Sequence, residues 1–152
     1  MSGDRFEIRL ALPSEKRALE ALQTRASLTN PGDRDALLAN PDAIDLPLEQ
    51  IGAGHVVVLE TAGSIKGFAA ILPRDDGNAD LDALFVEPDT WRQGCGRALI
   101  DYCAAMARDR GAGALHVIGN PHAEGFYRAC GFESMGTTTT RFAVGLLMRR
   151  VL

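Results

Sequence analysis

The sequence predicts an α+β fold in which helices flank a mixed, mostly antiparallel sheet. Two observations carry this prediction. Three strand-like segments follow one another between residues 55 and 86 with short turns between them, as in an antiparallel meander. A loop with two glycines then leads into a helix and another apolar strand, and a strand–helix–strand crossover makes its two strands parallel.

The first third of the chain predicts one strand and a few short helices. Residues 5–12 alternate between polar and apolar side chains, which is typical of a half-buried strand. Pro13 ends this strand, and Ser14 is a suitable N-cap for a helix over about 14–26. Further along, we expect a turn at 30–33, a short helix at 35–39 and a turn of helix near 48–51.

The remaining elements are predicted from apolar runs bounded by Gly, Asn and Asp. We expect strands at 55–60, 65–72, 81–86 and 114–118, helices at about 94–109 and 122–130, a strand from about 132 and a last strand at about 139–148. These segments make a sheet of about seven strands. Because no repeat, low-complexity segment or linker interrupts them, we expect residues 1–152 to form a single domain.

Composition narrows the class of protein. The formal net charge of -4 and the lack of a long basic stripe argue against nucleic-acid binding. Three cysteines, with no metal-type spacing, indicate a reducing compartment and no metal site. The N-terminus lacks the features of a signal peptide, and no apolar run is long enough to span a bilayer. We therefore expect a cytoplasmic protein without membrane contact.

The loop between residues 86 and 96 is the strongest chemical signal. A strand that enters a helix through a glycine loop aims backbone N–H groups and the helix dipole at one point, which suits a phosphate. A Walker loop needs Lys and then Ser or Thr after its last glycine, but Arg97 and Ala98 follow Gly96. A dinucleotide fingerprint needs Gly or Ala in place of Leu99 and an earlier parallel strand. Acyl-coenzyme A is the third candidate ligand.

Two motifs carry a resemblance to a known family. They are Val86-x-Pro88 with Gly94-Cys95-Gly96-Arg97-Ala98-Leu99, and Asn120-x-x-Ala123-x-x-Phe126-Tyr127-x-x-x-Gly131-Phe132. Their order and separation resemble the acetyl-CoA signatures of the GNAT superfamily of N-acetyltransferases. The resemblance covers nearly the whole chain and is sharpest over residues 81–132. One departure is Trp91, which stands where the family usually has Gln or Arg.

The resemblance implies a splayed pair of parallel strands that binds the acyl-CoA. It implies that the strand before the loop pairs with the pantetheine amides, that the loop amides cradle the pyrophosphate, and that the second motif contributes further contacts. Gly94 and Gly96 can also simply permit a tight turn. The residues so implicated in acetyl-CoA binding are Leu84, Phe85, Val86, Arg92, Gln93, Gly94, Cys95, Gly96, Arg97, Asn120, Ala123 and Phe126.

Tyr127 is the expected general acid, because the resemblance places it beside the thioester sulfur. A phenol with a pKa near 10 is protonated at neutral pH and matched to a thiolate leaving group of pKa about 8.5. Its alternative role is packing. Asp82, on the strand leading to the thioester, is a candidate general base, an ammonium ligand or a solvated acid. Glu60 and His55 are weaker candidates.

Other roles follow from local chemistry. Cys95 lies at a helix N-terminus, which lowers a thiol pKa, but it is expected to be a small loop residue in place of an aliphatic one. Asn120 can bind the pantetheine arm, cap the helix, or both. A backbone N–H near Phe85 or Val86 is the expected oxyanion donor. His116 is expected to be a hydrogen-bonded core residue.

The acetyl acceptor is not specified by the sequence. The resemblance places its site around residues 24–51 together with the C-terminal strands. Polar side chains of residues 24–51 have no diagnostic arrangement: Arg25, Ser27, Thr29, Asp33 and Asp35. The two functions to weigh are an acetyltransferase acting on a primary amine and a non-catalytic acetyl-CoA sensor or docking module. Members of the superfamily often dimerise through C-terminal strands, and the apolar run at 142–147 fits either a homodimer interface or the core.

Overall fold

A computed structural model describes residues 6–40, 42–139 and 144–152. Seven strands form one sheet in the order β1-β2-β3-β4-β5-β7-β6. The pairs β1–β2, β2–β3, β5–β7 and β6–β7 are antiparallel, and β4–β5 is parallel. The predicted α+β fold with a mixed sheet is confirmed.

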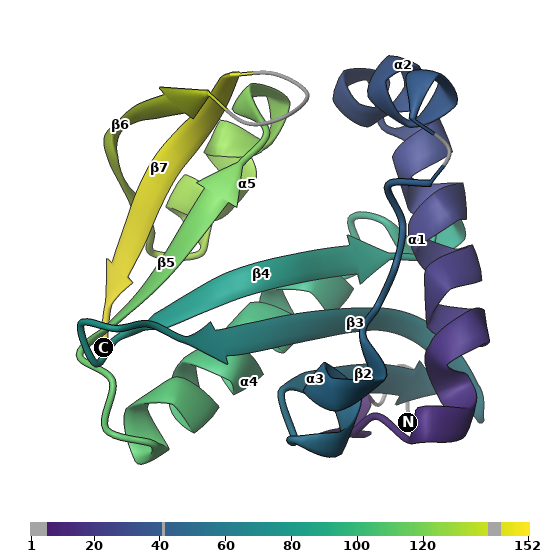
Figure 1. Ribbon diagram of the computed structural model, residues 1–152, viewed down its shortest axis with the longest axis horizontal. Coiled ribbons are helices and arrows are strands. Elements are labelled where there is room, and N and C mark those ends of the chain that lie inside the picture. The colour runs from purple at the N-terminus through teal and green to yellow at the C-terminus, as the bar shows by residue number, and fades with distance from the viewer. Residues whose placement is uncertain (1–5, 41, 140–143) are drawn as a thin grey trace. The chain divides into compact units, whose positions relative to one another are not determined.

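The chain divides into two compact units. The first unit comprises residues 1–70 and 83–99, and the second comprises 71–82 and 100–152. Elements of the first unit are β1 (Glu7–Leu10), η1 (Pro13–Glu15), α1 (Lys16–Thr29), α2 (Pro31–Ala39), α3 (Leu48–Gly52), β2 (Val56–Thr61) and η2 (Pro88–Thr90). Elements of the second unit are β5 (Ala114–Gly119), η3 (Pro121–Ala123), α5 (Glu124–Ala129), β6 (Glu133–Thr139) and β7 (Val144–Val151). Three elements have residues in both: β3 (Ser64–Pro73), β4 (Ala79–Val86) and α4 (Cys95–Asp109) (Figure 1).

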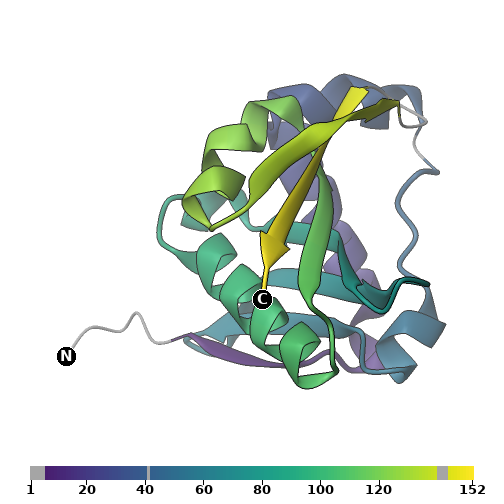
Figure 2. The same cartoon turned by 90° about the vertical axis from the view of Figure 1, so that its left-hand side faces the viewer.

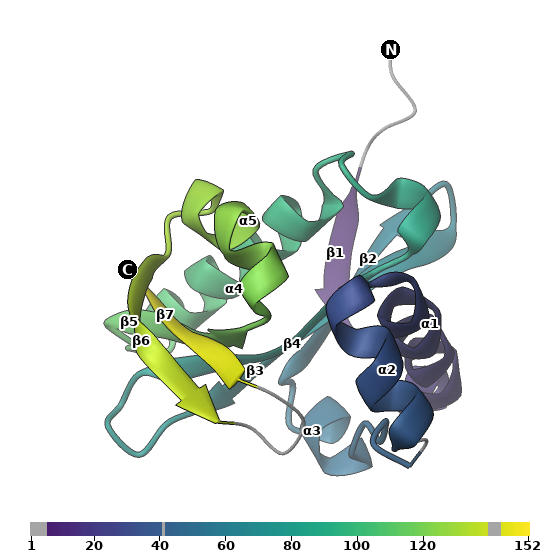
Figure 3. The same ribbon diagram turned by 90° about the horizontal axis from the view of Figure 1, so that it is seen from above.

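The core of the first unit gathers apolar side chains from α1, α3, β2 and β3. Its fully buried members include Leu19 and Leu22 on α1 and Phe68 on β3. Phe85 of β4 packs against this cluster, with its ring centroid 5.6 Å from that of Phe68. Helices α1 and α2 lie side by side (Figure 3). The core therefore fixes the end of β4 against β3, and the glycine loop begins from that end.

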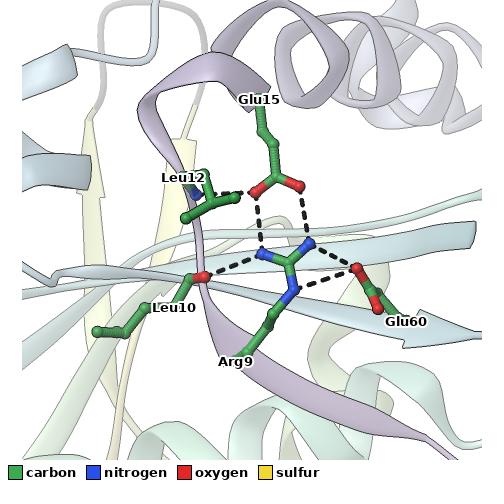
Figure 4. Close-up of polar contacts among 5 residues, drawn as sticks. All are labelled: Arg9, Leu10, Leu12, Glu15 and Glu60. Carbon is green, nitrogen blue, oxygen red and sulfur yellow. Dashed lines mark hydrogen bonds and ion pairs between the residues drawn. The ribbon is translucent and has the colours of Figure 1, made fainter. Parts of the chain in front are cut away.

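Arg9 ties β1 to η1 and β2 (Figure 4). Its guanidinium donates to both carboxylate oxygens of Glu15, at 3.0 and 2.7 Å, and to Glu60 Oε1 from Nε at 3.1 Å. Glu15 Oε1 also accepts the Leu12 N–H at 2.8 Å. The bonds from Arg9 lower the pKa of Glu15. Ser14 was expected to cap the first helix, and that was wrong. Ser14 lies within η1, and the Glu15 carboxylate accepts the hydrogen bond from the Leu12 N–H at the start of η1.

The second unit is built on the paired strands β5, β7 and β6 (Figure 2). Leu115 and Val117 of β5 and Met148 of β7 are buried on one face. Asn78 Oδ1 accepts the N–H groups of Gly113, at 3.0 Å, and Ala114, at 3.1 Å. These bonds hold the turn before β4 against the start of β5.

The parallel pairing of β4 with β5 covers three residue pairs, from Ala79↔Leu115 to Leu81↔Val117. Strand β4 continues for five residues after Leu81, to Val86, and β5 continues to Gly119 in register with β7. The strand–helix–strand crossover predicted from the glycine loop is thus present, with a short paired segment.

Several element boundaries differ from the prediction. Residues 30–33 were expected to be a turn, but Pro31 begins α2, since its fixed φ and missing N–H suit the first position of a helix. The helix expected at 122–130 is divided into η3 and α5. Strand β7 begins at Val144, and part of the strand expected at 139–148 and of the apolar run at 142–147 lies outside the described residues.

Candidate functional site

The glycine loop of the first unit is a tight turn followed by a helix N-terminus. Trp91 has φ -59° and ψ 146°, and Arg92 has φ 66°, which are the angles of a type II turn. Gly94 also has a positive φ, 88°, and its carbonyl accepts the Ala98 N–H at 3.0 Å. Gly94 therefore ends the loop, and the N–H groups of the first turn of α4 have no carbonyl within the helix to bond.

Positive side chains accompany these amides. Arg92 and Arg97 are exposed, and so is Gln93, whose amide donates to the Asp89 carbonyl at 3.3 Å. A left-handed backbone at an arginine costs roughly 1–2 kcal/mol relative to its ordinary conformation. Strain of this kind at a loop that presents N–H groups suits a binding role for the loop.

Cys95 lacks the activated thiol that a helix N-terminus can produce, in line with its expected role as a small loop residue. The residue is buried, with 2% of its surface exposed. Burial raises the pKa of the thiol and outweighs the Thr90 hydrogen bond and the Lys66 charge, which act in the opposite direction. Cys103 and Cys130 are also buried, and neither is in a disulfide. Cys95 thus contributes its backbone to the loop, and its sulfur packs in the interior.

At the end of β4, one edge of the strand faces β3 and the other does not. The Glu87 N–H donates to the Lys66 carbonyl of β3 at 2.7 Å, and a Cβ built at Gly67 of β3 would lie 3.1 Å from the Phe85 carbonyl oxygen. Backbone groups along a strand alternate in direction. Phe85 and Glu87 therefore direct their N–H and C=O groups toward β3, and Val86 directs its own toward the opposite edge.

Trp91 is bonded to that opposite edge. Its indole Nε1–H donates to the Val86 carbonyl oxygen at 2.9 Å. The sequence suggested no role for this side chain. The bond places the glycine loop and the last carbonyl of β4 in contact.

Arg25 and Glu87 connect α1 to the start of the loop. The Arg25 guanidinium donates through Nε at 2.9 Å and through Nη2 at 2.5 Å to the two carboxylate oxygens of Glu87. Arg25 therefore connects α1 to the loop. Of the other polar residues in the expected acceptor region, Thr29 donates its hydroxyl to the Arg25 carbonyl within α1, and Ser27 is buried. Asp33 and Asp35 lie on α2.

Tyr127 of α5 belongs to an aromatic cluster in the second unit. Its ring lies edge-on to Phe126, at 5.3 Å between centroids, and to Phe132, at 5.6 Å. Gly119, at the end of β5, makes room for it: a Cβ built there would lie 3.0 Å from Tyr127 Cε2. Sequence reasoning missed Gly119. Its only signal was a glycine directly before Asn120, which reads equally well as a turn residue.

The other residues of the second motif surround this cluster. Asn120 Oδ1 accepts the His122 N–H at 2.9 Å, so its predicted capping role is confirmed. Ala123 ends η3, and Phe126 remains partly exposed beside Tyr127. Binding of the pantetheine arm by Asn120, Ala123 or Phe126 stays a prediction.

Asp82 lies on β4 within the second unit and has a perturbed carboxyl group. Desolvation by its surroundings raises the pKa of Asp82 even though the side chain keeps contact with solvent, and the charge of Asp80 adds to the shift. Asp80 is paired with Arg74 at 2.8 Å. Of the weaker base candidates, Glu60 is bonded to Arg9.

His116 pairs with Asp80 in the β4–β5 register. It was expected to be a hydrogen-bonded core residue. Instead, it is half-buried, and its Nε2 has no hydrogen-bond partner among the residues that the structure describes.

Comparison with known proteins agrees with this geometry. The model of the acetyltransferase (GNAT) family matches residues 20–132, which include both the glycine loop and the Tyr127 motif. The chain belongs to the GNAT family. No curated protein matches this GNAT chain.

Solved structures share the fold at low sequence identity. A GCN5-related N-acetyltransferase from Rhodopseudomonas palustris has a TM-score of 0.78 at 20% identity, with 100% of this chain and 99% of that chain covered. A ribosomal-protein-alanine N-acetyltransferase from Brucella melitensis has 0.71 at 24%, covering 96% and 99%. The PaiA N-acetyltransferase from Thermoplasma acidophilum, solved in complex with coenzyme A, has 0.77 at 13%, covering 97% and 99%. These neighbours confirm the predicted GNAT-type architecture.

Two further properties concern the residues that the structure describes, namely the length and hydropathy of the helices and the clustering of possible metal ligands. No helix among them has the length and apolar character needed to cross a membrane. No group of three or more His, Cys, Asp or Glu side chains in the described ranges is arranged to hold a metal ion.

Proposed function

We propose that this GNAT protein is an acetyl-CoA-dependent N-acetyltransferase that acts on a primary amine, with residues 1–152 working as a single catalytic domain in the cytoplasm. The observation that carries the proposal is the loop between β4 and α4. Positive φ angles at Arg92 and Gly94 turn the chain so that the amides of the first turn of α4 converge, as binding of a pyrophosphate requires.

The residues of the first unit hold the coenzyme in this proposal. The amides of residues 92–97 bind the pyrophosphate, with Arg92 and Arg97 adding positive charge. The pantetheine amides pair with the edge of β4 that faces away from β3, to which Leu84 and Val86 direct their backbone groups. Phe85 directs its own backbone toward β3 and contributes by fixing the strand to the core.

The reaction is a direct acyl transfer. The neutral amine attacks the thioester carbonyl, and the tetrahedral oxyanion accepts a hydrogen bond from a backbone N–H of β4 that is not paired with the pantetheine. The C–S bond then breaks, and the leaving thiolate takes the phenolic proton of Tyr127. The positively charged nitrogen of the new amide loses its extra proton to the phenolate, which regenerates the Tyr127 phenol. Asp82 accepts the proton that the ammonium group of the acceptor must lose. Its raised pKa makes it a better base than an ordinary aspartate.

The experiment that tests this function follows free thiol released from acetyl-CoA with a panel of amines. The panel contains peptide N-termini, lysine, aminoglycosides, polyamines and small amine metabolites. With an accepted amine, Tyr127→Phe should lower kcat by about 10²-fold or more, the range expected for loss of a general acid, and leave the Kd for acetyl-CoA unchanged. Release at the wild-type rate by Tyr127→Phe would remove the tyrosine from the mechanism.

The same experiment, together with a measurement of acetyl-CoA binding, distinguishes the acetyltransferase from the alternative function. Clear binding of acetyl-CoA with no thiol release for any amine would favour a non-catalytic sensor or docking module. If the protein binds neither acetyl-CoA nor CoA, the proposed ligand is wrong. Measurement of the molar mass in solution tests the homodimer that the superfamily resemblance suggests.

A further inference from the structure

Trp91 is the only tryptophan of the chain, and it connects two parts of the first unit. Its indole N–H donates to the Val86 carbonyl at 2.9 Å, and 39% of the residue surface is exposed. Val86 is the last residue of β4, and Trp91 is the first central residue of the turn that leads to α4. A single side-chain bond thus spans the segment between the strand and the loop.

The bond satisfies a backbone group that no strand pairs with at that point. The carbonyl of Val86 is directed away from β3, as the contacts of its neighbours Phe85 and Glu87 with that strand require. A strand edge keeps its carbonyls open to any extended partner. Because the indole N–H takes one of the two lone pairs of this oxygen, an extended ligand on the edge meets a Val86 carbonyl that is already hydrogen-bonded. The indole therefore competes with such a ligand at the last carbonyl of β4.

Trp91 also acts on the turn. The positive φ of Arg92 is a strained backbone conformation, which persists only when the surrounding structure stabilises it. Thr90, which is buried, donates its hydroxyl to the Glu87 carbonyl at 2.8 Å, and Trp91 bonds to the preceding residue, Val86. Both bonds tie the turn to the end of β4, so the position of the loop amides is fixed relative to the strand edge.

We propose that Trp91 is a positioning residue. Its hydrogen bond fixes the loop that binds the pyrophosphate relative to the free edge of β4, so both binding surfaces are already in place for a ligand that contacts the two together. The inference rests on the proposed function, because acetyl-CoA is the ligand that reaches from the loop to the edge. It goes further by assigning a role to the one residue of the first motif that departs from the family pattern.

The experiment compares a ligand that contacts loop and strand with one that contacts the loop alone. Calorimetry gives the Kd of acetyl-CoA and of 3′-phosphoadenosine 5′-diphosphate, which lacks pantetheine, for wild type and Trp91→Phe. We expect Trp91→Phe to weaken acetyl-CoA binding by about three- to tenfold, as loss of one hydrogen bond predicts, and the nucleotide by less than about twofold. Tyr102→Phe, an exposed change on α4, is the matched control and should leave both Kd values unchanged.

A second replacement separates the hydrogen bond from the packing of the ring. Because Trp91 is the sole tryptophan, growth on benzothienylalanine replaces it alone and exchanges the N–H for a sulfur in a ring of the same size. The same selective loss of acetyl-CoA affinity supports the proposal even if Trp91→Phe folds poorly. Equal Kd values for acetyl-CoA in the replaced and wild-type proteins would overturn it, and so would an equal loss for both ligands. Failure of the wild type to bind acetyl-CoA would instead overturn the proposed function on which the inference rests.

Discussion

Gly119 and Tyr127 fit together because Gly119 has no side chain. A Cβ at Gly119 would lie 3.0 Å from Cε2 and 3.2 Å from Cδ2 of the Tyr127 ring, closer than most Cβ contacts, so the ring would have to shift. The end of β5 thus sets how far the ring of the candidate general acid can approach the strand. Phe126 and Phe132 limit the ring at its edges, so its position is fixed from several sides.

Gly119→Ala should displace the tyrosine ring and reduce catalysis. A small misplacement of a catalytic group costs up to about 10²-fold in rate, so we expect kcat to fall by roughly 10- to 100-fold. The Kd for acetyl-CoA should remain near the wild-type value. Gly125→Ala is the control: it lies on the same helix as Tyr127, its added Cβ has nothing within 4 Å, and activity should persist. Equal kcat for Gly119→Ala and Gly125→Ala would contradict this account.

The pH dependence of kcat/KM should report Asp82. A base works in its ionised form, so kcat/KM should rise with pH through the raised pKa of Asp82. Asp80→Asn removes the negative charge that contributes to the shift and should move this limb to lower pH. Asp82→Asn should abolish this rise of kcat/KM with pH. If the limb persists in Asp82→Asn, the proton is taken by another group, such as water.

Gly67→Ala should destabilise the end of β4. The new methyl would lie 3.0 Å from Leu99 Cδ1 and 3.1 Å from the Phe85 carbonyl oxygen, and the backbone atom cannot move without disturbing the strand. We expect a loss of about 1–3 kcal/mol in the free energy of unfolding, measured by urea denaturation. Gly52→Ala, which has nothing within 4 Å, should change it by less than about 1 kcal/mol. Wild-type stability for Gly67→Ala would show that β3 and β4 are not so closely packed.

Acid should weaken the fold partly through Glu15. Its folded-state pKa is lowered by Arg9, so its contribution is fully present above the unfolded pKa of about 4.3 and disappears as pH falls through the lower folded value. Between about pH 5 and 3, the Tm of Glu15→Gln should therefore decrease less steeply than that of the wild type. Glu7→Gln, at an exposed position on β1, should keep the wild-type slope. Identical slopes for all three proteins would remove Arg9 and Glu15 from the acid response.

The order of strands and helices could be predicted because it depends on local signals. Alternation, apolar runs and turn residues mark β1 to β5 within a few residues. The roles of single side chains depended instead on burial and on contacts that form only in the folded chain. Burial reverses the expected effect of the helix N-terminus on Cys95, and the role of Gly119 depends on a ring eight positions away. Trp91 had no predictable role, because its partner is a backbone carbonyl that becomes available only when β4 has folded against β3.

Thermal unfolding with and without acetyl-CoA tests the central claim most directly. A ligand at 100 times its Kd stabilises the folded state by about 2.7 kcal/mol, which corresponds to a rise in Tm of roughly 5–10 °C for a chain of this length. We expect such a rise with acetyl-CoA and with CoA. An unchanged Tm at millimolar concentrations of both would contradict it.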